Sequence, residues 1–186
     1  MQPSGKLWVP QFPASKSLDD LVEPFRSNAR RFLAALKQAN ATVVIADTLR
    51  RPERAYLMFF SFMIANNHME PSKAPPMPGV AIQWVHMDGA GQADAAGSLA
   101  AAKEMVAGYG IVFQPALFTR HSEGKAIDMS ISWEGNLTIV DGHGATVTIT
   151  STPRTGAANE DLMKVGASYG VIKLKSDAPH WSLDGH

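Results

Sequence analysis

The sequence has no cysteine, which removes disulfides, thiolate metal ligands and cysteine nucleophiles together. Histidine and carboxylate side chains are the strong metal ligands that remain. Neither sign of charge is in excess, because 17 Lys and Arg residues balance 17 Asp and Glu residues. Such a chain exerts no long-range pull on nucleic acid or on an anionic membrane. We therefore expect no nucleic-acid partner and a small or neutral target.

Long apolar runs are absent as well. No stretch approaches the roughly 18 apolar residues of a membrane-spanning helix. Residues 1–17 also lack the basic and then apolar segments of an export signal. We expect neither a membrane span nor a signal peptide. A chain of 186 residues can fold around its own hydrophobic core without a metal, so any metal bound here is expected to be catalytic.

The pattern of apolar residues predicts an α+β fold, with helices first and a small antiparallel sheet later. Residues 1–16, which hold three prolines, are expected to form an extended arm that lies on the domain or is loose in solvent. Residues 17–186 are expected to form a single domain. Helices are predicted over residues 17–36, 52–66, 95–108 and 159–169, with Ser17 as the first N-cap and a kink at Pro24.

The predicted strands fall into two groups. Strands are expected over residues 42–46, 80–86 and 171–174. Alternating apolar residues over 126–133, 137–140 and 145–150, separated by glycine-containing turns, predict an antiparallel meander.

Two segments carry residues that are typical of a metal site. The first, T-R-H-S-E-G-K-A-I-D at residues 119–128, places His121 and Asp128 seven residues apart, with Gly124 permitting a turn between them. The second, D-A-P-H-W, contains His180. Two imidazoles, one carboxylate and an open position for water make a catalytic zinc site. Taken separately, however, each motif is better explained by a surface or core histidine.

The first segment resembles the Ser-x-His-x-x-Gly-x-Ala-x-Asp signature of the D-alanyl-D-alanine carboxypeptidase family of zinc peptidases. This family includes the VanX-like and VanY-like enzymes and the L-alanyl-D-glutamate peptidases of phage endolysins. His121, Gly124, Ala126 and Asp128 match the signature, and Thr119 replaces the leading Ser. The resemblance implies that the fold is of the Hedgehog/DD-peptidase type, a small antiparallel sheet with helices packed on one side.

The second segment is similar to the family as well. Family members carry an acidic residue three positions before the last zinc-binding histidine, and Asp177 stands in that place before His180. The form Asp-x-Pro-His-aromatic, completed here by Pro179 and Trp181, is closer to the endopeptidase branch than to the Glu-x-Trp-His of the carboxypeptidases.

A weaker resemblance lies in T-L-R-R-P-E-R-A-Y-L, residues 48–57, which is similar to the family's Thr-x-Arg-Ser-x-x-x-Gln segment. Arg50 aligns with an arginine that points at the scissile carbonyl. The segment departs from the family at Arg51, where a small residue is usual, and at Ala55, where a Gln is usual. The register between Arg50 and Arg51 is therefore open, and either could be a solvated charge at the start of a helix. Residues 66–113 have no clear counterpart in the family.

The resemblance implies one Zn²⁺ per chain, and the residues it implies fall into three sets. The metal ligands are His121, Asp128 and His180, the catalytic residues are Asp177 as general base and Arg50 as oxyanion donor, and the substrate-binding residues are Thr119, Trp84 and Trp181. The two tryptophans are the weakest members, because aromatic residues on strands are more often part of the core. Glu123, between two of the ligands, is interpreted as a surface residue.

The implied activity is hydrolysis of the stem peptide of peptidoglycan, at the L-alanyl-D-glutamate bond, as in a bacteriolytic endolysin. A D-alanyl-D-alanine carboxypeptidase or dipeptidase is the alternative within the family. A cell-wall binding module of a phage particle, without turnover, is the alternative outside the enzymes. With no export signal expected, the chain would reach the cell wall through a holin pore or a secretion machine. The sequence leaves the oligomeric state open.

Overall fold

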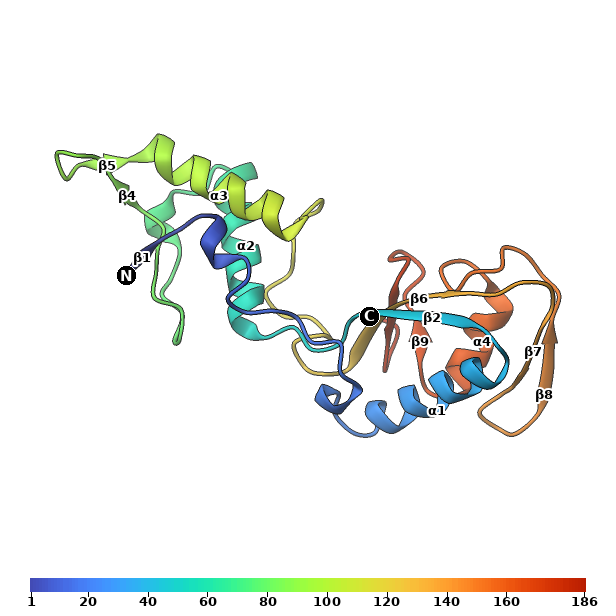
Figure 1. Ribbon diagram of the computed structural model, residues 1–186. Helices are drawn as coiled ribbons and strands as arrows, with labels where there is room; N and C mark the ends of the chain where they lie inside the picture. The colour runs from blue at the N-terminus through green and yellow to red at the C-terminus, as the bar shows by residue number, and fades with distance from the viewer. The chain divides into compact units, whose positions relative to one another are not determined.

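The computed structural model describes residues 1–186 and divides the chain into two compact units (Figure 1). The helical unit comprises Met1–Pro13 and Arg51–Thr119, and the sheet unit comprises Ala14–Arg50 and Arg120–His186. This division differs from the expected arm of residues 1–16 followed by a single domain. The physical reason is that each unit encloses a hydrophobic core of its own.

The sheet unit is built on a four-stranded antiparallel sheet with the strand order β2-β6-β10-β9. Helices α1 and α4 share one hydrophobic core with residues of this sheet. Strands β7 and β8 form a separate hairpin. The bounds are β2 Thr42–Asp47, β6 Ala126–Ser132, β9 Ile172–Lys173, β10 His180–Ser182, α1 Phe25–Gln38, α4 Glu160–Ser168, β7 Leu137–Val140 and β8 Thr146–Ile149.

The side-chain alternation along β6 separates the core from the opposite face of the sheet. Ile127, Met129 and Ile131 are buried in the core shared with the helices. Asp128 lies between them in the sequence and so points to the other face, because successive side chains of a strand alternate. Its partner in β10 is His180, and residues paired directly across strands share a face. The sheet therefore carries two of the predicted ligands on the face away from its core.

The helical unit contains helices α2 and α3 and three pairs of short strands or bridges around a second core. Its N-terminal strand β1 pairs in parallel with β3, and Trp8 is buried in the core. Residues 1–13 are therefore part of the helical unit, whereas residues 14–16 belong to the sheet unit. The bounds are β1 Gln2–Pro3, α2 Pro52–Asn66, β3 Ile82–Gln83, β4 His86–Met87, β5 Ala93–Asp94 and α3 Ala95–Tyr109.

The α+β fold class is confirmed, with four α-helices and antiparallel sheets. None of these helices is both long enough and apolar enough to cross a membrane. The predicted meander is wrong, because β6 pairs with β2 and β10 while β7 and β8 pair with each other. The first helix begins at Phe25, since Pro24 has no N–H to donate within a helix, and Ser17 caps only a short 3₁₀ helix.

Candidate metal centre

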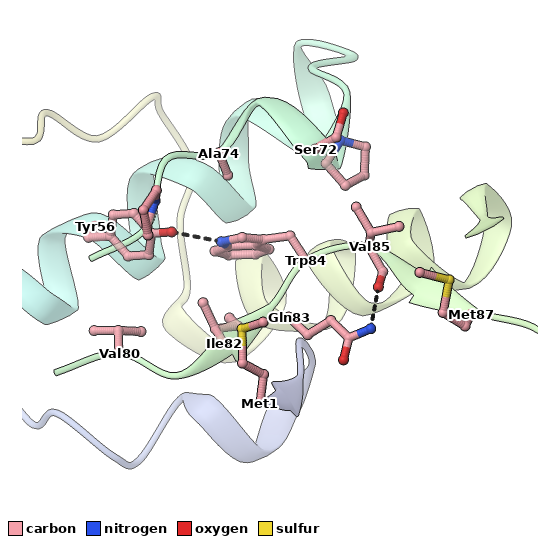
Figure 2. A pocket seen from close by; sticks show the side chains of 12 residues that line it. Met1, Tyr56, Ser72, Ala74, Val80, Ile82, Gln83, Trp84, Val85 and Met87 are labelled. Atoms are coloured by element: carbon pink, nitrogen blue, oxygen red, sulfur yellow. Dashed lines mark hydrogen bonds between the residues drawn. The ribbon is translucent and has the colours of Figure 1, made fainter. Parts of the chain in front are cut away.

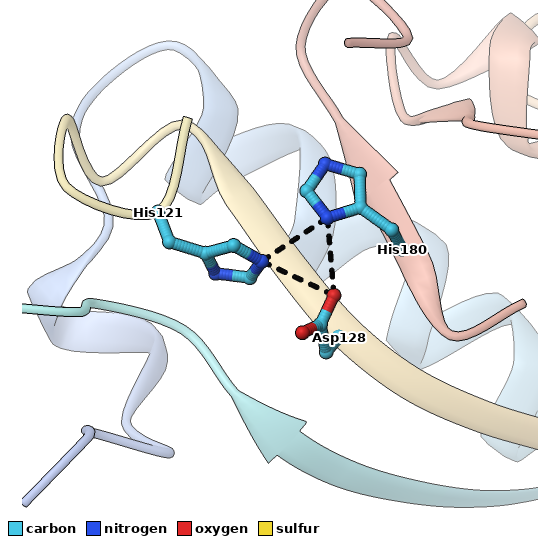
Figure 3. A group of neighbouring side chains, drawn as sticks. All are labelled: His121, Asp128 and His180. Atoms are coloured by element: carbon cyan, nitrogen blue, oxygen red, sulfur yellow. Dashed lines mark hydrogen bonds and ion pairs between the residues drawn. The ribbon is translucent and has the colours of Figure 1, made fainter. Parts of the chain in front are cut away.

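Three side-chain atoms converge on the face of the sheet that lies away from its core (Figure 3). His121 Nε2, Asp128 Oδ1 and His180 Nδ1 are separated by 3.1 Å in each of the three pairs. Metal bonds of about 2.0–2.1 Å in a tetrahedral site place ligand atoms about 3.3–3.4 Å apart, so only a small expansion would admit an ion. Both histidines are buried. This donor trio, His121, Asp128 and His180, could therefore hold a metal ion.

Two strands and one turn position the donor trio. Asp128 lies in β6 directly opposite His180, the first residue of β10. His121 lies in the turn that precedes β6, where the Gly124 N–H donates to the His121 carbonyl at 3.2 Å. Gly124 has a φ of 66°, and a Cβ there would lie 3.0 Å from the Asp20 carbonyl oxygen. The structure thus explains why a glycine separates the two ligands.

The outer nitrogen of each imidazole is held by a main-chain oxygen. His121 Nδ1 lies 2.9 Å from the Thr48 oxygen, and His180 Nε2 lies 3.0 Å from the His186 oxygen. These oxygens only accept hydrogen bonds, so each outer nitrogen carries a proton and donates it. The lone pairs of the two inner nitrogens then face Asp128 Oδ1, which is itself an acceptor. Three lone pairs at one point require a cation between them, either protons or a metal ion.

The pKa values of Asp128 and His121 reflect this arrangement. Burial by itself would raise the pKa of the Asp128 carboxyl, but hydrogen bonds and positive charge from His121 and His180, when protons occupy their inner nitrogens, outweigh it and hold that pKa far below its usual range. Burial by itself would lower the pKa of His121, and contact with Asp128 outweighs it and raises the pKa. Protons and a metal ion therefore compete for the same lone pairs.

Arg50 lies next to the donor trio. Its main-chain N–H donates to the His121 carbonyl at 3.2 Å, and its positive charge acts against the rise that Asp128 causes in the His121 pKa. Arg51 begins the helical unit as the exposed N-cap residue of α2. Of the two arginines between which the sequence left the register open, Arg50 is the one that the sheet unit places beside His121.

Asp47 is a site residue that the sequence analysis missed. A bulge in β2 between Ile45 and Asp47 places Asp47, rather than Ala46, opposite Asp128. Asp47 Oδ2 accepts a hydrogen bond from Arg50 at 3.0 Å, whereas its buried Oδ1 has no partner. The spacing of three residues between Asp47 and Arg50 is visible in the sequence. The bulge that turns Asp47 to the face of the donor trio is not.

The two acidic candidates for a general base are in different environments. Asp177 is exposed in the loop just before β10, and no ion pair or hydrogen bond holds its carboxylate. Glu123 is exposed too, but it forms ion pairs with Arg120 at 2.9 Å and Lys125 at 3.2 Å. These two cations hold the pKa of Glu123 below its usual value. Glu123 is therefore a paired surface residue, as the sequence indicated.

The three expected substrate-binding residues are divided between the two units. Trp181 has no exposed surface and packs against Phe32, with ring centroids 5.6 Å apart, so its place on the core face of β10 excludes contact with a substrate. Trp84 is buried in the helical unit, where its Nε1 donates to the Tyr56 hydroxyl at 2.9 Å beside a pocket (Figure 2). Thr119 is the last residue of the helical unit, two positions before His121.

Comparison with known proteins assigns no family, because no protein-family model and no curated protein matches the chain.

The first testable prediction concerns the donor trio. Replacing His121, Asp128 or His180 with Ala should weaken metal binding by on the order of 100-fold or more, because each residue supplies one of three lone pairs. Elemental analysis after dialysis measures the bound metal. His143→Ala is the matched control, since His143 is exposed in the turn between β7 and β8, and it should bind metal like the original chain. Full occupancy in any of the three trio variants would contradict the ligand assignment.

Proposed function

We propose that the chain is a zinc peptidase that hydrolyses the stem peptide of peptidoglycan, with one zinc ion held by His121, Asp128 and His180. The proposal rests on the convergence of three lone pairs, one from each member of the donor trio. Main-chain acceptors fix the orientation of both imidazoles. Two histidines and one carboxylate leave a coordination position open, which is the composition of catalytic zinc sites rather than of structural ones.

The resemblance to the D-alanyl-D-alanine carboxypeptidase family agrees with this geometry. The three residues that its signatures name as ligands are the same three that converge on the sheet. The sheet unit also supports a Hedgehog/DD-peptidase-like fold, because its helices share the core on one face while Asp128 and His180 occupy the other. We place the scissile bond between L-alanine and D-glutamate, since the Asp177 to Trp181 segment is closer to that branch of the family.

Zinc at such a site supplies a Lewis acid that polarises a carbonyl group and lowers the pKa of water. The chain supplies the remaining groups. Arg50, beside His121, would donate to the oxyanion that develops from the scissile carbonyl. Asp177 would accept a proton from the attacking water and pass it to the leaving amine. Its carboxylate is free of other partners in the structure, as a proton carrier requires, whereas Glu123 is bound by two cations.

Digestion of purified sacculi tests the proposed reaction. We expect zinc-loaded protein to release fragments with new N-terminal D-glutamate, identified by mass spectrometry. The His121→Ala variant should release none, because it lacks a ligand. Free D-alanine in place of new D-glutamate ends would show a carboxypeptidase instead. Zinc-loaded protein that binds sacculi without releasing any fragment would show a binding module and refute the proposal.

Arg50 and Arg51 form a matched pair for the second functional test. Arg50→Ala should lower kcat and kcat/KM together by on the order of 100-fold, since a donor to the transition state is lost. Arg51→Ala should change either by less than about twofold, because its side chain is exposed in the helical unit. Zinc content and thermal stability are measured alongside, because Arg50→Ala also leaves the buried Asp47 without its ion pair.

The role of Asp177 is tested by Asp177→Asn. We expect this variant to keep its zinc and its KM while kcat falls by about 100- to 10,000-fold, the range for loss of a general base. Glu123→Gln is the matched control, and its kcat should stay within about twofold of the original. If Asp177→Asn instead loses zinc and regains normal kcat in excess zinc, Asp177 only orients a ligand.

A further inference from the structure

Lys173, on β9, is a buried lysine that the proposed reaction does not use. Only 7% of its surface is exposed, and lysine is almost never buried to this degree without compensating partners. Its ammonium has three hydrogen-bond acceptors, all of them main-chain carbonyls. Lys173 Nζ lies 2.5 Å from the Leu174 oxygen, 2.5 Å from the Asp177 oxygen and 3.2 Å from the His180 oxygen. An ammonium has three N–H donors, so these bonds satisfy it completely.

These three carbonyls belong to the loop of residues 174–179 and to the histidine that follows it. Two tight turns shape the loop, since the Asp177 N–H donates to the Leu174 carbonyl at 3.2 Å and the His180 N–H donates to the Asp177 carbonyl at 3.1 Å. The side chain of Lys173 therefore binds the same carbonyls that close the turns. The exposed Asp177 carboxylate has no bond of its own, so the main chain alone determines the region that it can reach.

Electrostatic interactions also favour the Lys173 ammonium in this position. Burial lowers the pKa of Lys173, and the negative charges of Asp177 and Asp128 act against that shift. The ammonium also lies 5.8 Å from the centroid of the Trp181 ring, within the range of a cation–π contact. Its surroundings thus combine three acceptors, an aromatic face and the charges of two carboxylates, one of which, Asp128, belongs to the donor trio.

We propose that Lys173 is a positioning residue of the metal centre. Its ammonium organises the 174–179 loop so that the His180 imidazole and the Asp177 carboxylate are held in place. It acts through the main chain and contacts neither a metal-ligating atom nor the carboxylate of Asp177. The effect on His180 concerns metal binding alone, whereas the effect on Asp177 rests on the proposed peptidase function.

Lys173→Met tests the inference, because methionine keeps a long apolar side chain and removes the three donors. Lys175→Met is the matched control, since Lys175 is two residues away in the same loop but exposed, with a surface ion pair to Glu160 at 3.1 Å. We expect Lys173→Met to raise the Kd for zinc, measured by chelator competition, by about 10- to 100-fold, as for other residues that orient ligands. Lys175→Met should stay within about twofold.

Hydrogen exchange in the zinc-free proteins separates positioning from general stability. In Lys173→Met the amides of Asp177 and His180 should exchange faster, while the amides of β6 that pair with β2 keep their protection. Unchanged zinc affinity in folded Lys173→Met would overturn the proposal. So would a Lys173→Met chain that fails to fold while Lys175→Met folds, because that would assign Lys173 to the stability of the sheet unit.

The zinc measurement stands apart from the peptidase hypothesis. If the original chain binds zinc but cleaves no muropeptide, the proposed function fails, and the effect of Lys173 on zinc affinity is still decided. If the original chain does cleave, Lys173→Met measured at saturating zinc should lose at least about tenfold in kcat through Asp177. A normal kcat under those conditions would restrict the role of Lys173 to His180 and overturn the part that concerns Asp177.

Discussion

The antiparallel pairing of β6 with β10 is the constraint on which the candidate metal centre depends. This pairing sets Asp128 opposite His180 and Ile127 opposite Trp181. A slip of one residue would move each of these side chains to the other face of the sheet. Trp181 has no exposed surface and fills the core against α1 and α4, so the hydrophobic core holds the register. The packing of one face therefore positions the ligands on the other.

The main chain around the donor trio decides what the trio can bind. Main-chain oxygens accept hydrogen bonds from the outer nitrogen of each imidazole. The inner nitrogens remain as acceptors that face a carboxylate. Three acceptor atoms that face one another repel unless a cation lies between them, so the site favours positively charged species. The β2 bulge adds Asp47 and, through it, the guanidinium of Arg50 next to His121. The buried Asp47, the half-buried Asp128 and Arg50 thus place charges of both signs near the histidines.

Two cationic side chains, Arg50 and Lys173, act on the donor trio in different ways. The charge of Arg50 partly opposes the protonation of His121 that contact with Asp128 favours, and a metal ion needs the neutral imidazole. Lys173 lies on the other side of His180 in the sheet order, on β9, and binds carbonyls rather than ligand atoms. The first acts through its charge and the second through the shape of a loop. The hydrogen-bond partners of both side chains lie within the sheet unit.

The sequence by itself determined the ligand types and most of the elements. Without cysteine, only histidine and carboxylate could form a strong metal site, and the segments around His121, Asp128 and His180 named the residues that the structure brings together. Helix α2 begins and ends as predicted, because proline at its first position and its run of apolar residues are local signals.

Tertiary structure alone decided the strand order, the division into two units, and the roles of Asp47, Lys173 and Trp181. Each depends on contacts between residues far apart in the chain. The β6 strand pairs with β2 and β10 instead of its neighbour β7, and a bulge turns Asp47 toward Asp128. Trp181 follows a metal-ligand candidate in the sequence, yet the alternation of the strand sends it into the core. From the sequence alone a lysine is expected at the surface, and only the tertiary structure shows the loop that buries Lys173.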